Sequence, residues 1–147
     1  MNILTIDQGT TGTKALIVNK AGRIVKSAYR EFTQIYPQPG WVEHDPEEIW
    51  QTVVATIEEV MHDFGDQIST VGISNQRETV VIWDRDTGKP LYNAIVWQCR
   101  RTSAICNSLK PYKDLIRKIT GLPLDAYFSG TKIKWLAENL DKFEPTY

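Results

Sequence analysis

A short segment rich in glycine and threonine lies between two apolar runs near the start of the chain, and it constrains the fold more than any other feature. The segment is Asp7-Gln8-Gly9-Thr10-Thr11-Gly12-Thr13-Lys14, and the apolar runs are residues 3–6 and 15–18. Two β-prone runs joined by a glycine-containing connection are typical of a β-hairpin. Glycine also leaves the backbone uncovered, so that an anion can approach its N–H groups. We therefore expect a hairpin whose loop, residues 7–14, is a candidate phosphate-binding loop.

The side chains of this loop suit phosphate and magnesium chemistry. The threonine hydroxyls add hydrogen-bond donors, and Lys14 adds a positive charge. Asp7 ends the first apolar run and fits Mg²⁺, which takes carboxylate and water oxygens and accompanies phosphates. The loop is not a Walker A motif, because the spacing G-x-x-x-x-G-K-S/T is absent and the loop joins a strand to a strand. An ordinary hairpin turn is the alternative, since glycine, threonine and aspartate are common in turns.

Composition and charge restrict the classes of partner. The 147 residues are 41% hydrophobic and 24% charged, which fits one globular domain of ordinary size. A net charge of -1 gives no long-range attraction for nucleic acid or an anionic membrane. No apolar run approaches the roughly 18 residues of a membrane span, and the N-terminus lacks a signal-peptide pattern, so we expect no membrane anchor and a cytoplasmic location.

Cys99 and Cys106 are expected to be reduced and to lie in one helix about 10 Å apart.

The order of the expected elements indicates a mixed α/β sheet. Antiparallel strands come first and helices are interleaved later. Residues 35–44 are punctuated by proline and glycine and are expected to form a loop from which Trp41 packs on the domain. The expected strands are residues 3–6, 15–18, 23–32, 68–74 (a buried strand), 79–83 and 92–97, and the expected helices are residues 45–64, 98–109, 114–119 and 131–140.

The first of these helices is the best specified. Asp45 is an N-cap residue, Pro46 takes the first helical position, Glu48 comes close to a capping box, and Gly65 supplies the stop. Its apolar residues recur at helical spacing, which predicts that the helix covers the sheet. They are Ile49, Val53, Ile57, Val60 and Phe64, with Trp50, Val54 and Met61 widening the stripe.

A second cluster of polar residues, Asn75-Gln76-Arg77-Glu78, lies where one apolar run ends and the next begins. Arg77 can donate to a hydroxyl of a small polyol and Glu78 can accept from one, and such charged partners form the stronger hydrogen bonds. Trp97 and Tyr127 are candidates for the apolar wall that a polyol's carbon skeleton needs. The alternative is an exposed turn salt bridge beside two core aromatic residues.

Six segments, in order along the chain, resemble successive signatures of glycerol kinases, which belong to the FGGY family of carbohydrate kinases. The resemblance runs from residue 2 to the end and is therefore far more specific than any one motif. The segments are Asp7-Gln8-Gly9-Thr10-Thr11, Gly40-Trp41-Val42-Glu43-His44-Asp45-Pro46, Ser74-Asn75-Gln76-Arg77-Glu78-Thr79, Trp83-Asp84-Arg85-Asp86-Thr87-Gly88-Lys89-Pro90, Ala94-Ile95-Val96-Trp97-Gln98-Cys99-Arg100-Arg101-Thr102 and Tyr127-Phe128-Ser129-Gly130-Thr131-Lys132.

The resemblance implies a ribonuclease H-like fold of the actin and hexokinase type, with ATP in a cleft between two domains. It implies phosphorylation of glycerol to glycerol 3-phosphate with ATP and Mg²⁺, and a homo-oligomer for the full-length protein. The roles it implies are phosphate contact for Thr10, Thr11 and Gly12, nucleotide-phosphate contact for Lys14, Mg²⁺ binding for Asp7, and glycerol binding for Arg77, Glu78, Trp97 and Tyr127.

The loop departs from the family pattern at three positions. The family usually has serines where this chain has Gly12 and Thr13, and often an arginine where it has Lys14. The glycine removes a hydroxyl donor and leaves a backbone one. The lysine keeps the charge and loses the fork geometry of arginine. An altered phosphate affinity is therefore expected.

The catalytic base of the family is an aspartate from a later part of the chain, beyond Tyr147. Asp45 and Asp125 are the nearest local alternatives, and neither matches the family base. Residues 143–147 also show no closing element. We therefore expect residues 1–147 to be an incomplete N-terminal kinase domain, a partial ribonuclease H-like fold that is inactive by itself.

Two other kinds of function stay open from the sequence. One is a kinase of the same family that acts on another polyol or on a sugar such as xylulose. The other is a non-catalytic sugar- or nucleotide-binding module, or an actin-like structural domain, which would ignore glycerol.

Overall fold

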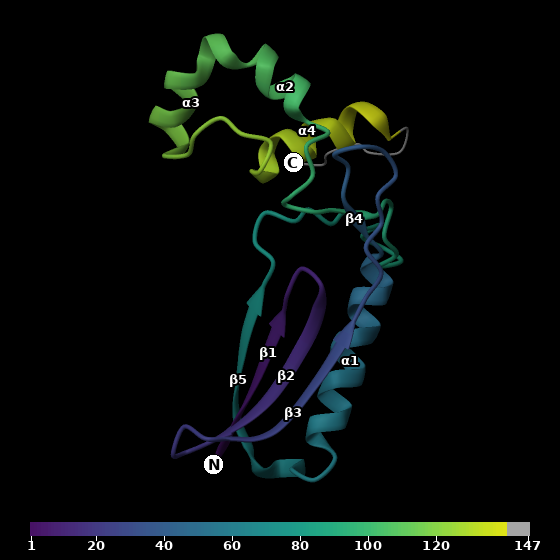
Figure 1. Cartoon of the computed structure of the whole chain (residues 1–147), viewed down its shortest axis with the longest axis vertical. Coiled ribbons are helices and arrows are strands. Elements are labelled where there is room, and N and C mark those ends of the chain that lie inside the picture. Colours follow the sequence, from purple (N-terminus) through teal and green to yellow (C-terminus); the bar gives the residue numbers. More distant parts are fainter. Residues whose placement is uncertain (141–147) are drawn as a thin grey trace.

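The computed structural model describes residues 1–140, and its centre is a four-stranded mixed sheet in the order β3-β2-β1-β5. β1 (Asn2–Gln8) and β2 (Gly12–Asn19) form the expected antiparallel hairpin, and β3 (Ile24–Glu31) pairs antiparallel with β2. β5 (Ile68–Asn75) lies parallel to β1 at the edge (Figure 1). The mixed α/β sheet expected from the sequence is confirmed. The chain end at residues 143–147, which the sequence analysis singled out, lies outside the described residues.

Helix α1 (Pro46–Met61) runs along one face of this sheet (Figure 1). Asp45 caps it by accepting a hydrogen bond from the Glu47 N–H, as expected. Glu48 does not complete a capping box, because its carboxylate instead accepts from the N–H and hydroxyl of Thr33. Val60 on the inner side of the helix joins a core made by Leu4, Ile6, Ala15, Ile17 and Ala28 of the sheet. A single-turn 3-10 helix (Gly65–Gln67) then leads into β5.

Two expectations about burial on this side of the sheet are wrong. Trp50 is 62% exposed, so it does not widen the core stripe of α1. β5 is not a buried strand, since Val71 is 51% and Ile73 is 74% exposed. Both residues pair in register with core residues of β1, Leu4 and Ile6, but α1 does not reach far enough across the sheet to cover them.

The segments between α1 and the C-terminal helices form fewer regular strands than expected. β4 (Glu43–His44), inside the expected loop, pairs with β6 (Ala94–Ile95). The prediction of full strands at 79–83 and 92–97 is therefore wrong. Within residues 92–97, only the two residues of β6 form a strand. The segment at 79–83 contributes only two isolated bridges, Val80 with Ile95 and Trp83 with Pro90.

Three short helices lie at the end of the molecule away from the N-terminus and the β2–β3 turn, the end toward which the β1–β2 turn points (Figure 1). They are α2 (Ser103–Ser108), α3 (Lys113–Thr120) and α4 (Ser129–Asn139), with a 3-10 turn (Lys110–Tyr112) between the first two. α3 ends as expected at Gly121, which has the left-handed backbone conformation (φ 74°). α2 is shorter than expected and excludes Cys99, but both cysteines are free. None of the helices within residues 1–140 is long and apolar enough to cross a membrane.

A buried ion pair holds β4 and the C-terminal helices together. Arg101 and Glu43 lie 2.5 Å apart (Nη2 to Oε1), with side chains 0% and 3% exposed. The Arg101 guanidinium lies 3.9 Å from the centre of the Trp41 ring and 4.7 Å from that of Trp135. Trp41 thus packs on the body of the domain, as the sequence predicts. Glu43 also accepts from the Tyr92 hydroxyl, so the carboxylate is compensated on several sides.

Candidate functional site

The loop between β1 and β2 is a tight turn closed by one backbone hydrogen bond, from the Gly9 N–H to the Gly12 carbonyl (3.0 Å). Asp7 and Lys14 are cross-strand partners at its base, and both side chains are exposed. Within residues 1–140, the N–H groups of Thr10 and Thr11 donate to no backbone or side-chain acceptor. Two free N–H groups in a turn, with a lysine nearby, are a fitting arrangement for an anion.

Gly12 is required by close packing. A Cβ atom at this position would lie 2.5 Å from the Arg30 carbonyl oxygen and 2.6 Å from the Tyr29 hydroxyl. Contacts this short do not occur for real Cβ atoms, so a side chain would force the backbone apart. Gly12, which departs from the family pattern, thus leaves the space that the Tyr29 side chain occupies. The Tyr29 hydroxyl lies 3.4 Å from Thr11 Oγ1.

A cavity of about 300 Å³ joins this loop to the second polar cluster. Trp97 is the link, because its indole N–H donates to the Thr10 hydroxyl (2.9 Å) while its ring stands 5.8 Å from the Tyr127 ring at 67°. Apolar ring faces and polar groups therefore line one hollow. Its lining residues are Gly9, Thr10, Asn75, Gln76, Arg77, Trp97 and Tyr127.

The remaining residues singled out from the sequence lie outside that lining. Asp7 and Lys14 are on the exposed strand ends, and Lys14 Nζ is 5.9 Å from the centre of the Tyr29 ring. Thr11 and Gly12 form the far side of the turn. Within residues 1–140, no three or more His, Cys, Asp or Glu side chains are grouped to hold a metal ion. A magnesium ion here would therefore depend on Asp7 together with phosphate oxygens and water.

Glu78 follows Arg77 of the cavity lining and has an unusual backbone conformation. Its φ of 67° is in the left-handed region, which is costly for a residue with a side chain. The carboxylate oxygen Oε2 accepts from both the N–H and the hydroxyl of Ser129, at 2.9 and 2.8 Å. Glu78 thereby caps the N-terminus of α4, where a negative charge is favourable. Within the described residues, its second oxygen, Oε1, accepts no hydrogen bond.

Lys132 supports the aromatic wall and was not assigned a role from the sequence. The side chain is fully buried, and its ammonium donates to the Tyr127 carbonyl and, at 3.4 Å, to the Phe128 carbonyl. Burial lowers the pKa of Lys132 to about 8. Its contact with the Tyr127 carbonyl, five residues earlier, comes from the turn before α4, which the sequence did not predict.

A buried histidine behind the loop was also missed. His44 is fully buried, its Nε2 lies 2.8 Å from Gln34 Oε1, and its Nδ1 lies 3.4 Å from Gln76 Nε2. Desolvation is the main cause that lowers the pKa of His44, to about 4, against a smaller opposing effect of the Glu48 charge. The imidazole is therefore neutral at pH 7.

The buried His44 is expected to make stability depend on pH. Its folded pKa of about 4 lies below the unfolded value of 6.5, so the unfolded chain binds the proton more readily. The stability is complete above pH 6.5 and is lost as the pH falls toward 4; at pH 5 the loss is about 2 kcal/mol. Denaturant unfolding at pH 7 and pH 5 measures it. His44→Gln should remove this pH dependence, whereas His62→Gln should keep it; an unchanged slope in His44→Gln would contradict the assignment.

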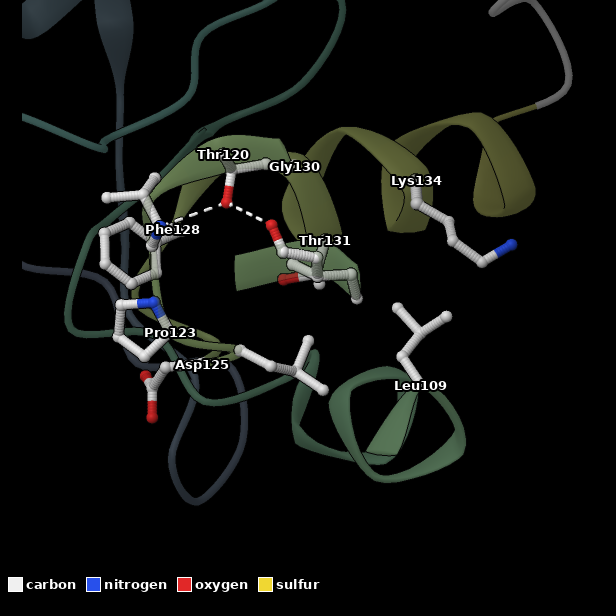
Figure 2. Close-up of a pocket in the computed structure, with 11 residues that line it drawn as sticks. Leu109, Thr120, Pro123, Asp125, Phe128, Gly130, Thr131 and Lys134 are labelled. Atoms are coloured by element: carbon white, nitrogen blue, oxygen red, sulfur yellow. Dashed lines mark hydrogen bonds between the residues drawn. The ribbon is translucent and has the colours of Figure 1, made fainter. Parts of the chain in front are cut away.

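A second cavity, of about 240 Å³, lies between α3 and α4 and is apolar. Figure 2 shows Leu109, Pro123 and Phe128 in its wall, while the Asp125 carboxylate and the Lys134 ammonium point outward. The Thr120 hydroxyl in this wall is already bonded to the Ile116 carbonyl and the Leu122 N–H. Asp125 is paired with Arg100, which lowers the pKa of its carboxyl. This cavity thus offers few free polar groups, and a polyol fits the Thr10–Trp97 cavity better.

Comparison with known proteins gives consistent matches over nearly the whole chain. A family model for the N-terminal domain of the FGGY family of carbohydrate kinases matches residues 2–144. The glycerol kinase of Bacillus velezensis is 58% identical, over 95% of this chain and 29% of that protein. Glycerol kinase 2 of Thermotoga maritima is 51% identical over the same shares. The chain therefore spans 29% of the length of these relatives.

Solved structures match equally well. The crystal structure of Plasmodium falciparum glycerol kinase with ADP has a TM-score of 0.88 and 40% identity, over 96% of this chain and 29% of that one. The ligand-bound xylulose kinase of Lactobacillus acidophilus has a TM-score of 0.86 and 25% identity, over 94% of this chain and 28% of that one. The fold is thus that of the sugar-kinase ATPases, in partial form.

Proposed function

Because the chain belongs to the FGGY family of carbohydrate kinases, we propose that it supplies the phosphate- and acceptor-binding side of a glycerol kinase. The reaction is transfer of the γ-phosphoryl group of ATP to a terminal hydroxyl of glycerol. The observation that carries the proposal is the cavity in which the Trp97 indole bonds the Thr10 hydroxyl, so that the acceptor residues adjoin the phosphate loop. The identity of 51–58% to relatives named glycerol kinases supports glycerol as the acceptor.

Each residue has a role in this proposal. The N–H groups of Thr10 and Thr11 donate to the phosphate oxygens, and the charge of Lys14 neutralises them. Asp7 holds Mg²⁺, which supplies further charge neutralisation when bound. Arg77 donates to glycerol hydroxyls, and Oε1 of Glu78 accepts from one while Oε2 stays bonded to Ser129. Trp97 and Tyr127 pack on the carbon skeleton.

The proton acceptor is proposed to come from elsewhere. Asp45 caps α1 and Asp125 is paired with Arg100, so neither carboxylate is available in the cavity. We therefore infer that residues 1–147 bind and orient ligands without turnover, and that they form part of an N-terminal kinase domain. Use of ATP favours a cytoplasmic location, and homo-oligomerisation of the full-length protein stays a prediction.

Arg77 provides the test of the acceptor site. Arg77→Ala is expected to weaken glycerol binding by more than about tenfold, because a charged hydrogen-bond donor is lost. Isothermal calorimetry of the chain with glycerol measures the change. Arg85→Ala is the matched control, since Arg85 is an exposed arginine in the turn after Trp83 and is not among the residues that line the cavity.

Titration with other ligands separates the alternatives. Binding of xylulose in preference to glycerol would indicate a kinase of the same family that phosphorylates a sugar instead of glycerol. Binding of ATP·Mg²⁺ without glycerol would favour a nucleotide-binding or actin-like module. A chain that binds neither ligand would contradict the proposal.

A further inference from the structure

Behind the phosphate loop, six residues form a closed ring of hydrogen bonds. The Thr10 carbonyl accepts from Gln34, which contacts His44, and His44 contacts Gln76. The side-chain oxygen Oε1 of Gln76 accepts from the Thr79 hydroxyl (2.9 Å), and Thr79 Oγ1 accepts from the Trp97 backbone N–H (3.2 Å). The Trp97 indole returns to the Thr10 hydroxyl. The ring therefore connects both walls of the cavity through one buried residue, His44, and five half-buried ones.

The direction of the hydrogen bonds is fixed by backbone carbonyls at two points. Gln34 Nε2 faces the carbonyl oxygens of Thr10 (3.0 Å) and Phe32 (3.4 Å), so this end of the amide must be the donor and Oε1 the acceptor. Gln76 Nε2 faces the Gly9 carbonyl at 3.3 Å and the Gln8 side-chain oxygen at 3.2 Å, so it too must be the NH₂ group. Neither amide can be turned round without setting oxygen against oxygen.

His44 lies between these two amides and can satisfy both in only one form. Its Nε2 faces an acceptor, Gln34 Oε1, and must carry the hydrogen. Its Nδ1 faces a donor, Gln76 Nε2, and must present a lone pair. The neutral Nε2–H tautomer meets both conditions, and either other form would set two donors or two acceptors against each other.

The two glutamines also determine which way the loop's peptide groups point. Gln34 donates to the carbonyl oxygen of Thr10 and Gln76 to that of Gly9, which also accepts from the Gln8 amide at 2.8 Å. In a trans peptide the N–H points opposite to the C=O, so the N–H groups of Thr10 and Thr11 are turned away from the ring. These are the two N–H groups that donate to no acceptor within residues 1–140.

We propose that His44 is a positioning residue of the phosphate loop: as the neutral Nε2–H tautomer, it holds the Gln34 and Gln76 amides in place, and these amides turn the Thr10 and Thr11 N–H groups toward a bound phosphate. The inference rests on the proposed function for the phosphate. The tautomer and the ring direction follow from the contacts alone and are tested separately.

The first test is the ¹⁵N spectrum of the histidine rings in the wild-type chain at pH 7. His44 is expected to show a pyridine-like Nδ1 and a pyrrole-like, protonated Nε2. His62, whose side chain is 83% exposed and whose Nδ1 contacts only Asp63, is the internal control and should lack this fixed tautomer. A protonated Nδ1 on His44, alone or together with Nε2, would overturn the inference.

The second test uses two variants of His44, each of which keeps only one of its two hydrogen bonds, either the one to Gln34 or the one to Gln76. In His44→Gln the side-chain NH₂ can still reach Gln34, whereas in His44→Asn the shorter amide can still accept from Gln76. We expect His44→Gln to shift mainly the Thr10 amide signal, which shares a peptide group with the Gly9 carbonyl. We expect His44→Asn to shift mainly the Thr11 amide and the Trp97 indole N–H. The same shifts in both variants, or none beyond those in His62→Gln, would overturn the inference.

The third test is titration with ATP·Mg²⁺. Both variants are expected to bind about tenfold more weakly than the wild type, because the N–H groups lose their fixed direction. Equal binding by the wild type and both variants overturns the inference about His44 alone. Absence of binding by the wild-type chain, with the expected tautomer present, contradicts the proposed function instead.

Discussion

Replacing Arg101 with alanine is expected to lower the free energy of unfolding by about 3–5 kcal/mol. The guanidinium is 0% exposed, and it donates to Glu43, to the Tyr92 hydroxyl (3.4 Å) and to Cys99 Sγ (3.1 Å). Its removal leaves the Glu43 carboxylate, 3% exposed, without its counter-charge. It also removes the cation that packs against the Trp41 ring. Denaturant unfolding followed by tryptophan fluorescence measures the loss.

The neighbouring arginine is a matched control. Arg100 pairs with Asp125 at 2.6 Å, but the two side chains are 52% and 42% exposed. Arg100→Ala should therefore cost less than about 1 kcal/mol. Replacing both Arg101 and Glu43 by apolar residues of similar size should cost less than Arg101→Ala alone, since no charge is left unpaired. A loss in Arg101→Ala no larger than in Arg100→Ala would show that burial of this pair is unimportant.

Gly12→Ser is expected to destabilise the chain by about 3 kcal/mol, at the upper end of the cost of overpacking. The added Cβ meets the Arg30 carbonyl at 2.5 Å, and a backbone atom of a paired strand cannot move aside as a side-chain end can. Gly12 also closes the β1–β2 turn through its carbonyl, so a shift of Gly12 away from β3 should disturb the turn and weaken binding of ATP·Mg²⁺ as well. Thermal unfolding and nucleotide titration measure the two effects.

Substitution of a second glycine in a strand is the control that distinguishes the effect of a steric clash from the effect of losing a glycine. Gly72 lies in β5, and a Cβ there would meet nothing within 4 Å, so Gly72→Ala should be neutral or slightly stabilising. Adding Tyr29→Ala to Gly12→Ser should recover part of the loss, because it removes the 2.6 Å contact but not the carbonyl contact. Full recovery would place the whole conflict at Tyr29 and contradict the role given to the Arg30 carbonyl.

The part of the fold that the sequence predicts well is built from local signals. The β1–β2 hairpin has glycines in its turn, and α1 has its cap residue at Asp45 and apolar residues at helical spacing. The expected strand at 79–83 fails because β-prone residues cannot reveal whether a partner strand is present. Val80 finds only a single bridge to Ile95, since Ile95 is shared with β4.

The parts of the site that could not be predicted depend on buried polar residues. Glu43 and His44 form the whole of β4 and are both buried, which is the reverse of the pattern by which strands are recognised. Their burial depends on partners far away in the sequence, Arg101 for one and Gln76 for the other. Arg77, Trp97 and Tyr127 could be singled out by residue type and position, but the link from Trp97 to Thr10 needed the three-dimensional fold.

The hydrogen-bond ring also sets an order of events during synthesis. The β1–β2 hairpin joins residues close in sequence and can form as soon as β2 has left the ribosome. The ring that holds its turn closes only through the contact between Thr10 and Trp97, which are 87 positions apart. A nascent chain that ends before Trp97 therefore lacks the indole contact that closes the ring, although Gln34, His44 and Gln76 have already been made. The β1–β2 loop can thus form early in synthesis, whereas the contacts that complete its geometry form only after Trp97 has been synthesised.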